Sequence, residues 1–145
     1  MQQLNFPQYN FKIKKSDKTE IFDIIRRKYV ALTPEEWVRQ HFIHYLILEK
    51  KFPQSLLAVE MNIVLNKMQK RCDIVGYSNK GKPVLIVECK APGVKISQKT
   101  FEQIAQYNIA LQVKYLAISN GLKHYFCEID FEKKSYKFLK EKEFK

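Results

Sequence analysis

Apolar and polar positions group into short blocks along the chain, and these blocks predict two helices and several strands. The first helix is predicted to begin after Thr33, an N-cap residue followed by Pro34, and to continue to about Lys50. Thr33 and Glu36 have the spacing of a capping box. The second helix is predicted over residues 97–112. Its stripe of core-facing positions comprises Phe101, Ile104, Ala105, Asn108 and Leu111.

The remaining blocks are rich in β-branched residues or alternate between apolar and polar, which is typical of strands. Strands are predicted over residues 9–15, 20–23, 56–65, 71–77, 83–89, 115–119 and 122–131. The short polar connections favour antiparallel hairpins, and Asn120 with Gly121 is the strongest such signal. The order is therefore (ββ)-α-β-β-β-α-β-β, which indicates a mixed α/β (α+β) fold class.

The chain of 145 residues is predicted to form a single domain, because it contains no repeat, low-complexity tract or linker rich in Pro, Gly or Ser. The core is expected at about residues 31–131, with an N-terminal hairpin at about 9–23 and a basic C-terminal tail at about 132–145. A content of 46% apolar and 28% charged residues is typical of soluble globular proteins.

No segment indicates a membrane or secreted protein. The longest dense apolar stretch, residues 42–48, is too short to cross a bilayer. The first residues lack the pattern of a secretory signal. Three cysteines without a CxxC motif argue against both a disulfide scaffold and a zinc knuckle. We therefore expect a cytoplasmic protein with no membrane partner.

Charge is the first property that indicates a partner. The net charge of +11 suits a polyanion, nucleic acid first and an anionic membrane second, while a soluble basic protein without such a partner is the alternative. The net charge is +4 in residues 1–30, −1 in residues 31–60 and +5 in residues 61–95. The most basic of these segments contains only two carboxylates, Asp73 and Glu88.

These two acids and Lys90 form the strongest candidate for a catalytic site. Glu88 and Lys90 are two residues apart on one predicted strand, so they share a face, and Asp73 on the neighbouring strand can lie opposite them. Two carboxylates at the edge of a sheet suit Mg²⁺, which keeps several waters and binds substrate phosphate. A lysine beside the metal can orient or deprotonate a water. The pattern therefore indicates phosphodiester hydrolysis.

The alternative interpretation is an ion pair between Glu88 and Lys90 at the end of a strand, because such charge pairs are common. The apolar run of residues 84–87 favours the site, since an acid that ends a buried strand needs a partner or a metal. By strand alternation, Cys72 and Cys89 are expected on the face opposite the acids, as small buried residues.

Gln103 and Tyr107 are a second pair of interest, because residues at i and i+4 share one face of a helix. Their amide and phenol can face the carboxylates or a phosphate backbone, and ordinary polar boundary residues are the alternative.

Two other patterns are set aside. Residues 76–82 match the first part of a P-loop, but a strand rather than a helix follows them. His41 and His44 lack the HExxH pattern of a metal site, and histidines so placed are more often surface or boundary residues.

In the order of its elements and motifs, the chain resembles the PD-(D/E)xK nuclease superfamily. More closely, it is similar to the N-terminal nuclease domain of type I restriction enzyme R subunits. The segments that carry this resemblance are Leu32–Gln40 (LTPEEWVRQ), Arg71–Val75 (RCDIV), Val87–Pro92 (VECKAP) and Gln103–Asn108 (QIAQYN). The resemblance covers most of residues 9–131. It implies a restriction-endonuclease-like core, a mixed β-sheet flanked by helices in α-β-β-β-α-β order, with an N-terminal β-hairpin.

The resemblance also implies a DNA endonuclease that depends on Mg²⁺, for which Mn²⁺ can substitute. The residues that match its catalytic motifs are Asp73, Glu88, Lys90, Gln103 and Tyr107. In this match Asp73 and Glu88 bind the metal, assisted by the backbone carbonyl of Cys89. Lys90 matches the catalytic lysine, and Gln103 and Tyr107 match a QxxxY motif that supports the active site and the DNA backbone.

The sequence departs from the family pattern at two positions. Cys72 stands where a proline often precedes the aspartate. Many members carry an acid on the first helix, but the corresponding stretch at Arg39 and Gln40 has none. Glu36 lies one turn earlier, and Glu60 on the first strand is the alternative source of that charge and a further candidate metal ligand.

These observations leave three functional hypotheses open. The leading one is an enzyme that cleaves DNA, because binding alone has no chemical need for Asp73, Glu88 and Lys90 together. The rival is a basic module that holds nucleic acid without cutting it. The third is a structural fragment of a larger restriction assembly, and in each case helicase or specificity subunits are possible partners, since the R subunits also carry a helicase motor.

Overall fold

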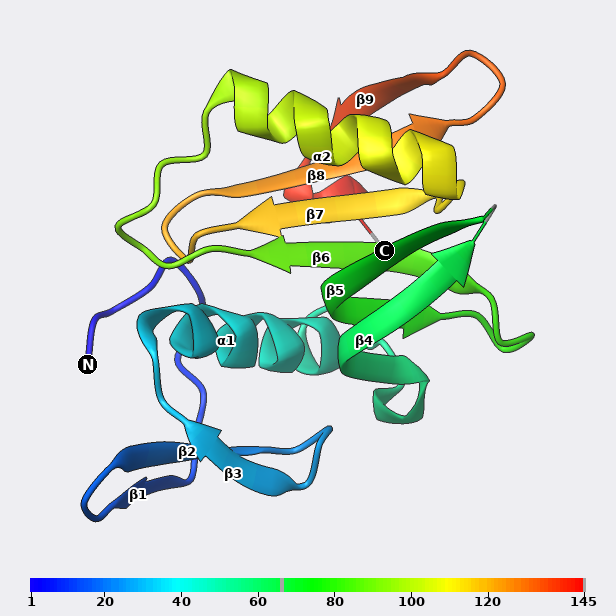
Figure 1. The fold of residues 1–145 in the computed structure, drawn as a ribbon. Helices are drawn as coiled ribbons and strands as arrows, with labels where there is room; N and C mark the ends of the chain where they lie inside the picture. Colours follow the sequence, from blue (N-terminus) through cyan, green and yellow to red (C-terminus); the bar gives the residue numbers. More distant parts are fainter. Residues whose placement is uncertain (66, 145) are drawn as a thin grey trace.

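The computed structural model describes residues 1–65 and 67–144 (Figure 1). Its elements, in chain order, are β1 (Ile13–Lys15), β2 (Thr19–Asp23), β3 (Lys28–Ala31), α1 (Pro34–Leu48), a 3₁₀ turn (Gln54–Leu56), β4 (Leu57–Leu65), β5 (Met68–Tyr77), β6 (Pro83–Cys89), α2 (Gln98–Leu111), β7 (Tyr115–Ser119), β8 (His124–Asp130), β9 (Ser135–Leu139) and a second 3₁₀ turn (Glu141–Glu143).

Six strands form one mixed sheet in the order β4-β5-β6-β7-β8-β9 (Figure 1). All neighbouring pairs are antiparallel except β6 and β7, which run parallel with Cys89 opposite Ser119. A parallel pair needs a crossover connection, and α2 provides it. The mixed sheet flanked by helices is therefore confirmed, and the predicted elements occur in the predicted order with two further strands, β3 and β9.

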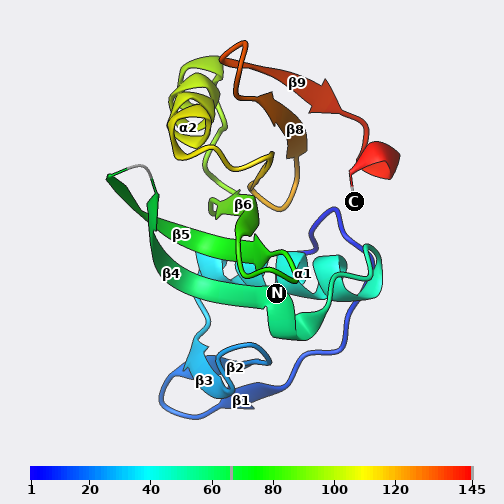
Figure 2. The ribbon, with the colours of Figure 1, turned by 90° about the vertical axis from the view of Figure 1, so that its right-hand side faces the viewer.

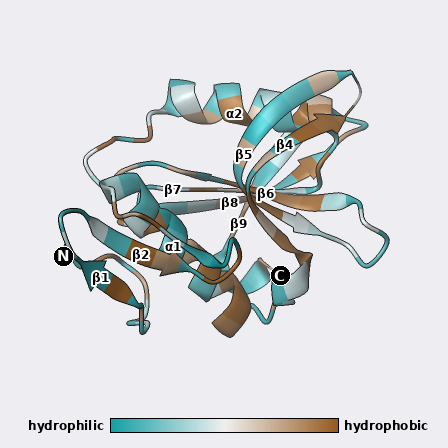
Figure 3. Ribbon diagram, turned by 60° about the horizontal axis from the view of Figure 1, so that its bottom comes forward, coloured by the Kyte–Doolittle hydropathy of each residue, from teal (hydrophilic) through white to brown (hydrophobic). Residues whose placement is uncertain are grey.

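The two helices cover opposite faces of this sheet (Figures 1 and 2). On β7, Ala117 lies in the apolar cluster of α1 with Phe42, whereas its neighbours Leu116 and Ile118 lie in the cluster of α2 with Phe101. Both helices carry hydrophobic and hydrophilic residues side by side, as the hydropathy colouring shows (Figure 3). Within the described residues, no helix is long and apolar enough to cross a membrane.

The N-terminal strands form a separate antiparallel sheet, β1-β2-β3, and α1 lies between this sheet and the six-stranded one (Figures 1 and 2). The hairpin predicted at 9–23 is present, but β1 begins only at Ile13 and a third strand follows it. Tyr9 and Phe11 do not pair in the sheet. Their rings instead lie 5.6 and 4.7 Å from the ring of His44 on α1, which explains the shorter strand.

The lysine-rich segment after Phe131, expected only as a basic tail, contains β9. This strand pairs with β8, with Phe138 opposite Cys127. The ring of Phe138 lies 5.0 Å from that of Phe101 on α2, so β9 extends the surface that α2 covers. The alternating Tyr136 and Phe138 were the only local signal for it.

The start of α1 is capped as predicted, but only from one side. The Thr33 hydroxyl accepts a hydrogen bond from the Glu36 backbone N–H at 3.0 Å. The capping-box spacing is thus used from the Thr33 side, while the Glu36 carboxylate accepts hydrogen bonds from the side chains of Arg26 and Arg39. The Glu36 carboxylate is thereby connected to the candidate site, because Arg39 also donates to Asp73.

Candidate active site

The carboxylate of Asp73 lies where β4, β5, β6 and α1 meet. The register between β4 and β5 lacks one pair, Glu60 opposite Asp73, and Glu60 has a φ of +55° there. Asp73 Oδ2 accepts a hydrogen bond from the backbone N–H of Cys89 at 2.8 Å, and its Oδ1 accepts one from Arg39 at 2.8 Å. The break in the β4–β5 pairing therefore occurs at Asp73, whose carboxylate is bonded both to the end of β6 and to α1.

Glu88 precedes the residue that Asp73 binds, so the two acids lie close together as predicted. Glu88 is only 9% exposed and forms an ion pair with Lys70 of β5. Burial raises the pKa of Glu88 above its ordinary value, the charge of Asp73 raises it further, and Lys70 and Lys90 act in the opposite direction. Two mutually repelling carboxylates and two cations thus share this end of β6.

Lys90 directly follows β6. Its backbone N–H donates to the carbonyl of Ser119 at 2.8 Å, which ties the residue to the end of β7. Its half-buried side chain acts electrostatically on Glu88, as expected for residues two apart on one strand face. The structure thus brings Asp73, Glu88 and Lys90 together, while their catalytic roles remain predictions.

Arg39 joins three of the acids. Its guanidinium donates to Glu36 at 2.5 Å, to Glu60 at 2.7 Å and to Asp73 at 2.8 Å. Glu60, the alternative metal ligand, also accepts from Arg71 at 2.7 Å. Arg39 therefore links Glu60 to Asp73, and it also links Asp73 to Glu36, the carboxylate on the first helix.

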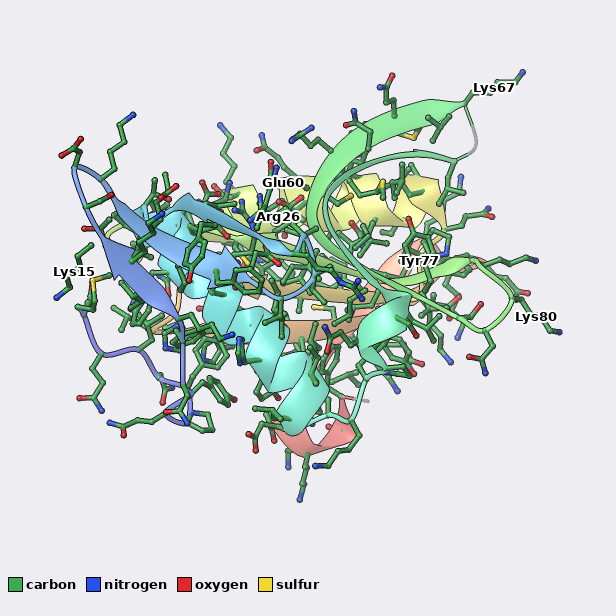
Figure 4. The ribbon with its side chains drawn as sticks, turned by 90° about the horizontal axis from the view of Figure 1, so that it is seen from below. Lys15, Arg26, Glu60, Lys67, Tyr77 and Lys80 are labelled. Atoms are coloured by element: carbon green, nitrogen blue, oxygen red, sulfur yellow. The ribbon has the colours of Figure 1, made fainter. Side chains whose placement is uncertain are left out.

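The same network extends into the small sheet. Arg26, in the connection between β2 and β3, donates to Glu36 at 2.8 Å and to Asp23 at 2.6 Å. Gln40 of α1 donates to both of these acids at 3.0 Å. Glu36 and Arg39 link Arg26 to Glu60 of the large sheet, and both end members of this chain of contacts are labelled in Figure 4. The N-terminal sheet is therefore fixed to the candidate site through charged side chains.

Of the second predicted pair, Gln103 and Tyr107, only Tyr107 lies against a residue of the candidate site. The Tyr107 hydroxyl donates to the backbone carbonyl of Gln69, and its ring lies 5.0 Å from the ammonium of Lys70. Tyr107 therefore touches the lysine that pairs with Glu88. Gln103 is exposed and lines a shallow groove beside Tyr107, without a contact to the carboxylates among the described residues.

Cys72 and Cys89 are both buried, as expected, but they do not share a face. Cys89 lies in the apolar cluster of α1, and Cys72 lies in a cluster with Ile86 on the side to which Glu88 belongs by strand alternation. The expected placement of Cys72 was wrong because the missing pair beside it interrupts the alternation along β5. Burial raises the pKa of Cys72 to about 12, so this thiol is not poised as a nucleophile.

The two patterns that were set aside have ordinary structural roles. Gly76 lies in β5, where a Cβ atom would approach the ring of Phe52 to 2.7 Å, and Gly81 occupies the β5–β6 turn with a φ of +77°. The Nδ1–H of His41 donates a hydrogen bond to the carbonyl of Trp37 at 2.8 Å, and the ring packs among aromatic rings. Burial lowers the pKa of both His41 and His44.

Sequence reasoning missed the two cations that contact the acids. Arg39 lies three residues after Glu36 on α1, and Lys70 lies three residues before Asp73 on β5. The available signal was proximity in sequence: Arg39 lies within the segment Leu32–Gln40, and Lys70 comes directly before the segment Arg71–Val75. Their partners lie far away in sequence, so no local pattern identifies which acid each cation contacts.

Chemically, the donor set fits a hard divalent cation. Asp73 and Glu88 would supply carboxylate oxygens near the Cys89 backbone, and the remaining positions of a Mg²⁺ shell would be filled by water and substrate phosphate. No group of three His, Cys, Asp or Glu side chains suited to a metal occurs among residues 1–65 and 67–144. A cation bound here would compete with Arg39 for Asp73 and with Lys70 for Glu88.

Comparison with known families identifies the family to which the chain belongs. The family described as the type I restriction enzyme R protein N terminus matches residues 34–142. The chain belongs to this family. The match includes α1, the whole six-stranded sheet and α2, but it begins after the small N-terminal sheet. No curated protein matches the sequence.

Membership of the R protein N-terminus family places the chain in the context of restriction systems and confirms the resemblance drawn from its four sequence segments. The candidate residues all lie within the matched region. Asp23 and Arg26, which extend the network, lie outside it.

Proposed function

We propose that this protein hydrolyses phosphodiester bonds in DNA with the help of a divalent metal, as part of a restriction system. The observation that carries the proposal is the convergence of Asp73, Glu88 and Lys90 at the end of β6, in a chain of net charge +11. Family membership supports the restriction context, in which further subunits and a cytoplasmic location are part of the proposal.

Each residue has a distinct task in this proposal. Asp73 and Glu88 would hold Mg²⁺ or Mn²⁺, assisted by the Cys89 carbonyl, and the bound metal would stabilise negative charge on the phosphate. Lys90 positions or deprotonates the attacking water. Tyr107 holds Lys70 close to Glu88, while Gln103 is placed to meet the DNA backbone along α2.

One observation favours a second candidate, a module that binds DNA without cutting it. Arg39 already neutralises Asp73, and Lys70 already neutralises Glu88. If these cations hold their positions, they occupy the space that a metal needs. The two candidates differ in whether Mg²⁺ displaces them, so metal binding and cleavage must be measured on the same protein.

Replacing Lys90 tests the catalytic assignment. We expect Lys90→Ala to reduce nicking of plasmid DNA by about 10²–10⁴-fold, because a positioned acid or base contributes that much. Lys90→Arg should restore little, since a guanidinium is broader and stays protonated. The rates are measured in Mg²⁺ and in Mn²⁺, with metal and DNA affinities determined alongside.

Lys95→Ala is the matched control, because Lys95 is an exposed lysine in the loop that follows β6. Nicking by this variant should equal that of the wild type, and Glu88→Gln should be inactive and lose metal binding. Equal nicking by Lys90→Ala and the wild type would remove Lys90 from the mechanism. DNA binding without metal binding or cleavage would favour the second candidate.

A further inference from the structure

The outer face of the small sheet carries two aromatic rings and two lysines that have no task in the proposed cleavage. Phe22 on β2 is paired in register with Tyr29 on β3, and their ring centroids are 5.3 Å apart. The ammonium of Lys12 lies 5.6 Å from the centroid of Phe22, and that of Lys14 lies 5.7 Å from the centroid of Tyr29. These four residues are called the platform below.

The platform faces solvent. Strand alternation places Phe22 opposite its neighbours Ile21 and Asp23, which are fully buried on the side of α1. Tyr29 is 40% exposed, and both platform lysines are exposed. Figure 4 views the molecule from below, the side on which Figure 1 shows this sheet beneath α1.

We propose that the platform binds single-stranded DNA, with bases stacked on Tyr29 and Phe22 and phosphates paired with Lys12 and Lys14. Aromatic rings that alternate with cations on an exposed sheet are suited to unpaired bases, because every base offers a π-face. Charge complementarity supports a polyanion, since residues 1–30 carry a net charge of +4 and one of their three acids, Asp23, is buried against Arg26.

The geometry favours a single strand over a duplex. In a duplex the bases are stacked on each other, so the rings of Tyr29 and Phe22 would have no base to cover. The two lysines lie over the rings in the absence of DNA, and their flexible stems allow the ammonium groups to move to phosphates when a base takes their place. A duplex would use the lysines alone.

The platform is also connected to the candidate active site. Arg26, in the connection between β2 and β3, donates to Glu36, and Glu36 and Asp73 both accept from Arg39. A strand held on the platform is therefore held by the same body of structure that positions the carboxylates. This inference rests on the proposed DNA substrate, and the platform lies outside the region that the family match covers.

The test measures binding of a short labelled oligothymidylate to the full chain by fluorescence anisotropy, in EDTA so that no cleavage occurs. We expect Tyr29→Ala to weaken binding about tenfold or more, the usual effect of removing a stacked ring, and Tyr29→Phe to retain affinity. Lys12→Gln with Lys14→Gln should lower the salt slope by about 1.4, as two lost phosphate contacts to a single strand would.

The matched control is Lys133→Gln with Lys134→Gln, which removes the same charge from an exposed turn before β9 and should leave oligonucleotide binding unchanged. Melting temperatures verify that each variant is folded. Unaltered binding by Tyr29→Ala, or equal losses from the two lysine pairs, would overturn the proposal. Binding that depends on Tyr29 in a protein that never cleaves DNA would support the platform while refuting the proposed enzyme.

Discussion

Asp23 shows how a buried charge is stabilised in this protein. It is 0% exposed, yet Oδ1 accepts from the backbone N–H groups of Ile25 and Arg26 at 2.7 and 2.9 Å. Oδ2 accepts from the side chains of Arg26 and Gln40 at 2.6 and 3.0 Å. Burial raises the pKa of Asp23, but these hydrogen bonds outweigh burial, so its pKa lies below the ordinary value.

Replacing this one carboxylate tests its contribution. We expect Asp23→Asn to lower the free energy of unfolding at neutral pH by about 3 kcal/mol, because Arg26 loses its buried partner. A carboxyl group with a lowered pKa in the folded state stabilises the fold above its unfolded pKa, and this contribution disappears as the pH falls through the folded pKa. The difference between variant and wild type should therefore be largest at neutral pH and shrink below about pH 4.

Urea denaturation at a series of pH values measures this difference. Asp17→Asn is the control, because Asp17 is exposed in the β1–β2 turn and should contribute almost nothing. A loss for Asp23→Asn that does not change with pH would mean that packing of the side chain, and not its charge, stabilises the turn.

For individual residues, the sequence indicated which acids form the candidate site, but it did not indicate which basic side chains contact them. Asp73 and Glu88 stood out because the segment around them contains no other carboxylate. Arg39 did not, since its contact with Asp73 spans 34 positions and depends on how α1 crosses the sheet. Spacing along a strand or helix predicts which side chains share a face, but it does not predict contacts between elements.

Among the elements, α2 ends in an unusual way. Its last turn is closed by Gln112, which has a left-handed conformation with φ of 60° and ψ of 43°. Its backbone N–H donates to the carbonyls of Asn108 and Ile109, at 3.0 and 3.2 Å. Helices that end in this conformation usually carry glycine there, because a Cβ atom disfavours positive φ. The helix therefore stores a small amount of strain at its C-terminus.

Gln112→Gly should release that strain and raise the free energy of unfolding by up to ~1 kcal/mol. Gln106→Gly is the control, because Gln106 is exposed in the middle of the same helix, where glycine costs roughly 1 kcal/mol. Thermal denaturation of both variants should thus shift the melting temperature in opposite directions. A decrease for Gln112→Gly would show that its side chain, and not its conformation, determines the stability of this end.

The elements that sequence patterns predicted are those with strong local signals. Thr33 with Pro34 marks the start of α1, and Asn120 with Gly121 marks the β7–β8 turn, where Gly121 has a φ of +86°. The two unpredicted strands, β3 and β9, both lie at sheet edges and have exposed, lysine-containing sequences. An edge strand is held mainly by backbone hydrogen bonds to one neighbour, which leave little trace in side-chain pattern.

Over the whole molecule, the positive charge is only partly free to meet DNA. In residues 61–95, the two basic residues Lys70 and Arg71 are paired with acids, and the remaining five basic residues have no ion pair among the described residues. Lys67 and Lys80 lie at the tips of two hairpins, well separated from each other (Figure 4). Arg26 and Arg39 are likewise ion-paired with acids of the buried network. Because the unpaired cations are spread over separate hairpins, any one face carries less positive charge than the net charge of the chain.

The number of unpaired cations on one face determines how strongly salt should weaken binding to duplex DNA. A face that contacts ~5 phosphates gives a slope of log affinity against log salt of about −4 to −5. We expect this slope for the wild type in EDTA, measured by anisotropy of a labelled duplex over a range of NaCl concentrations. Asp73→Asn should leave the slope nearly unchanged, because Arg39 keeps its bonds to Glu36 and Glu60 and stays within the network. A slope near zero would remove nucleic acid as the partner, whereas a slope near −10 would mean that the internally paired arginines and lysine also reach the DNA, and that the charged network opens on binding.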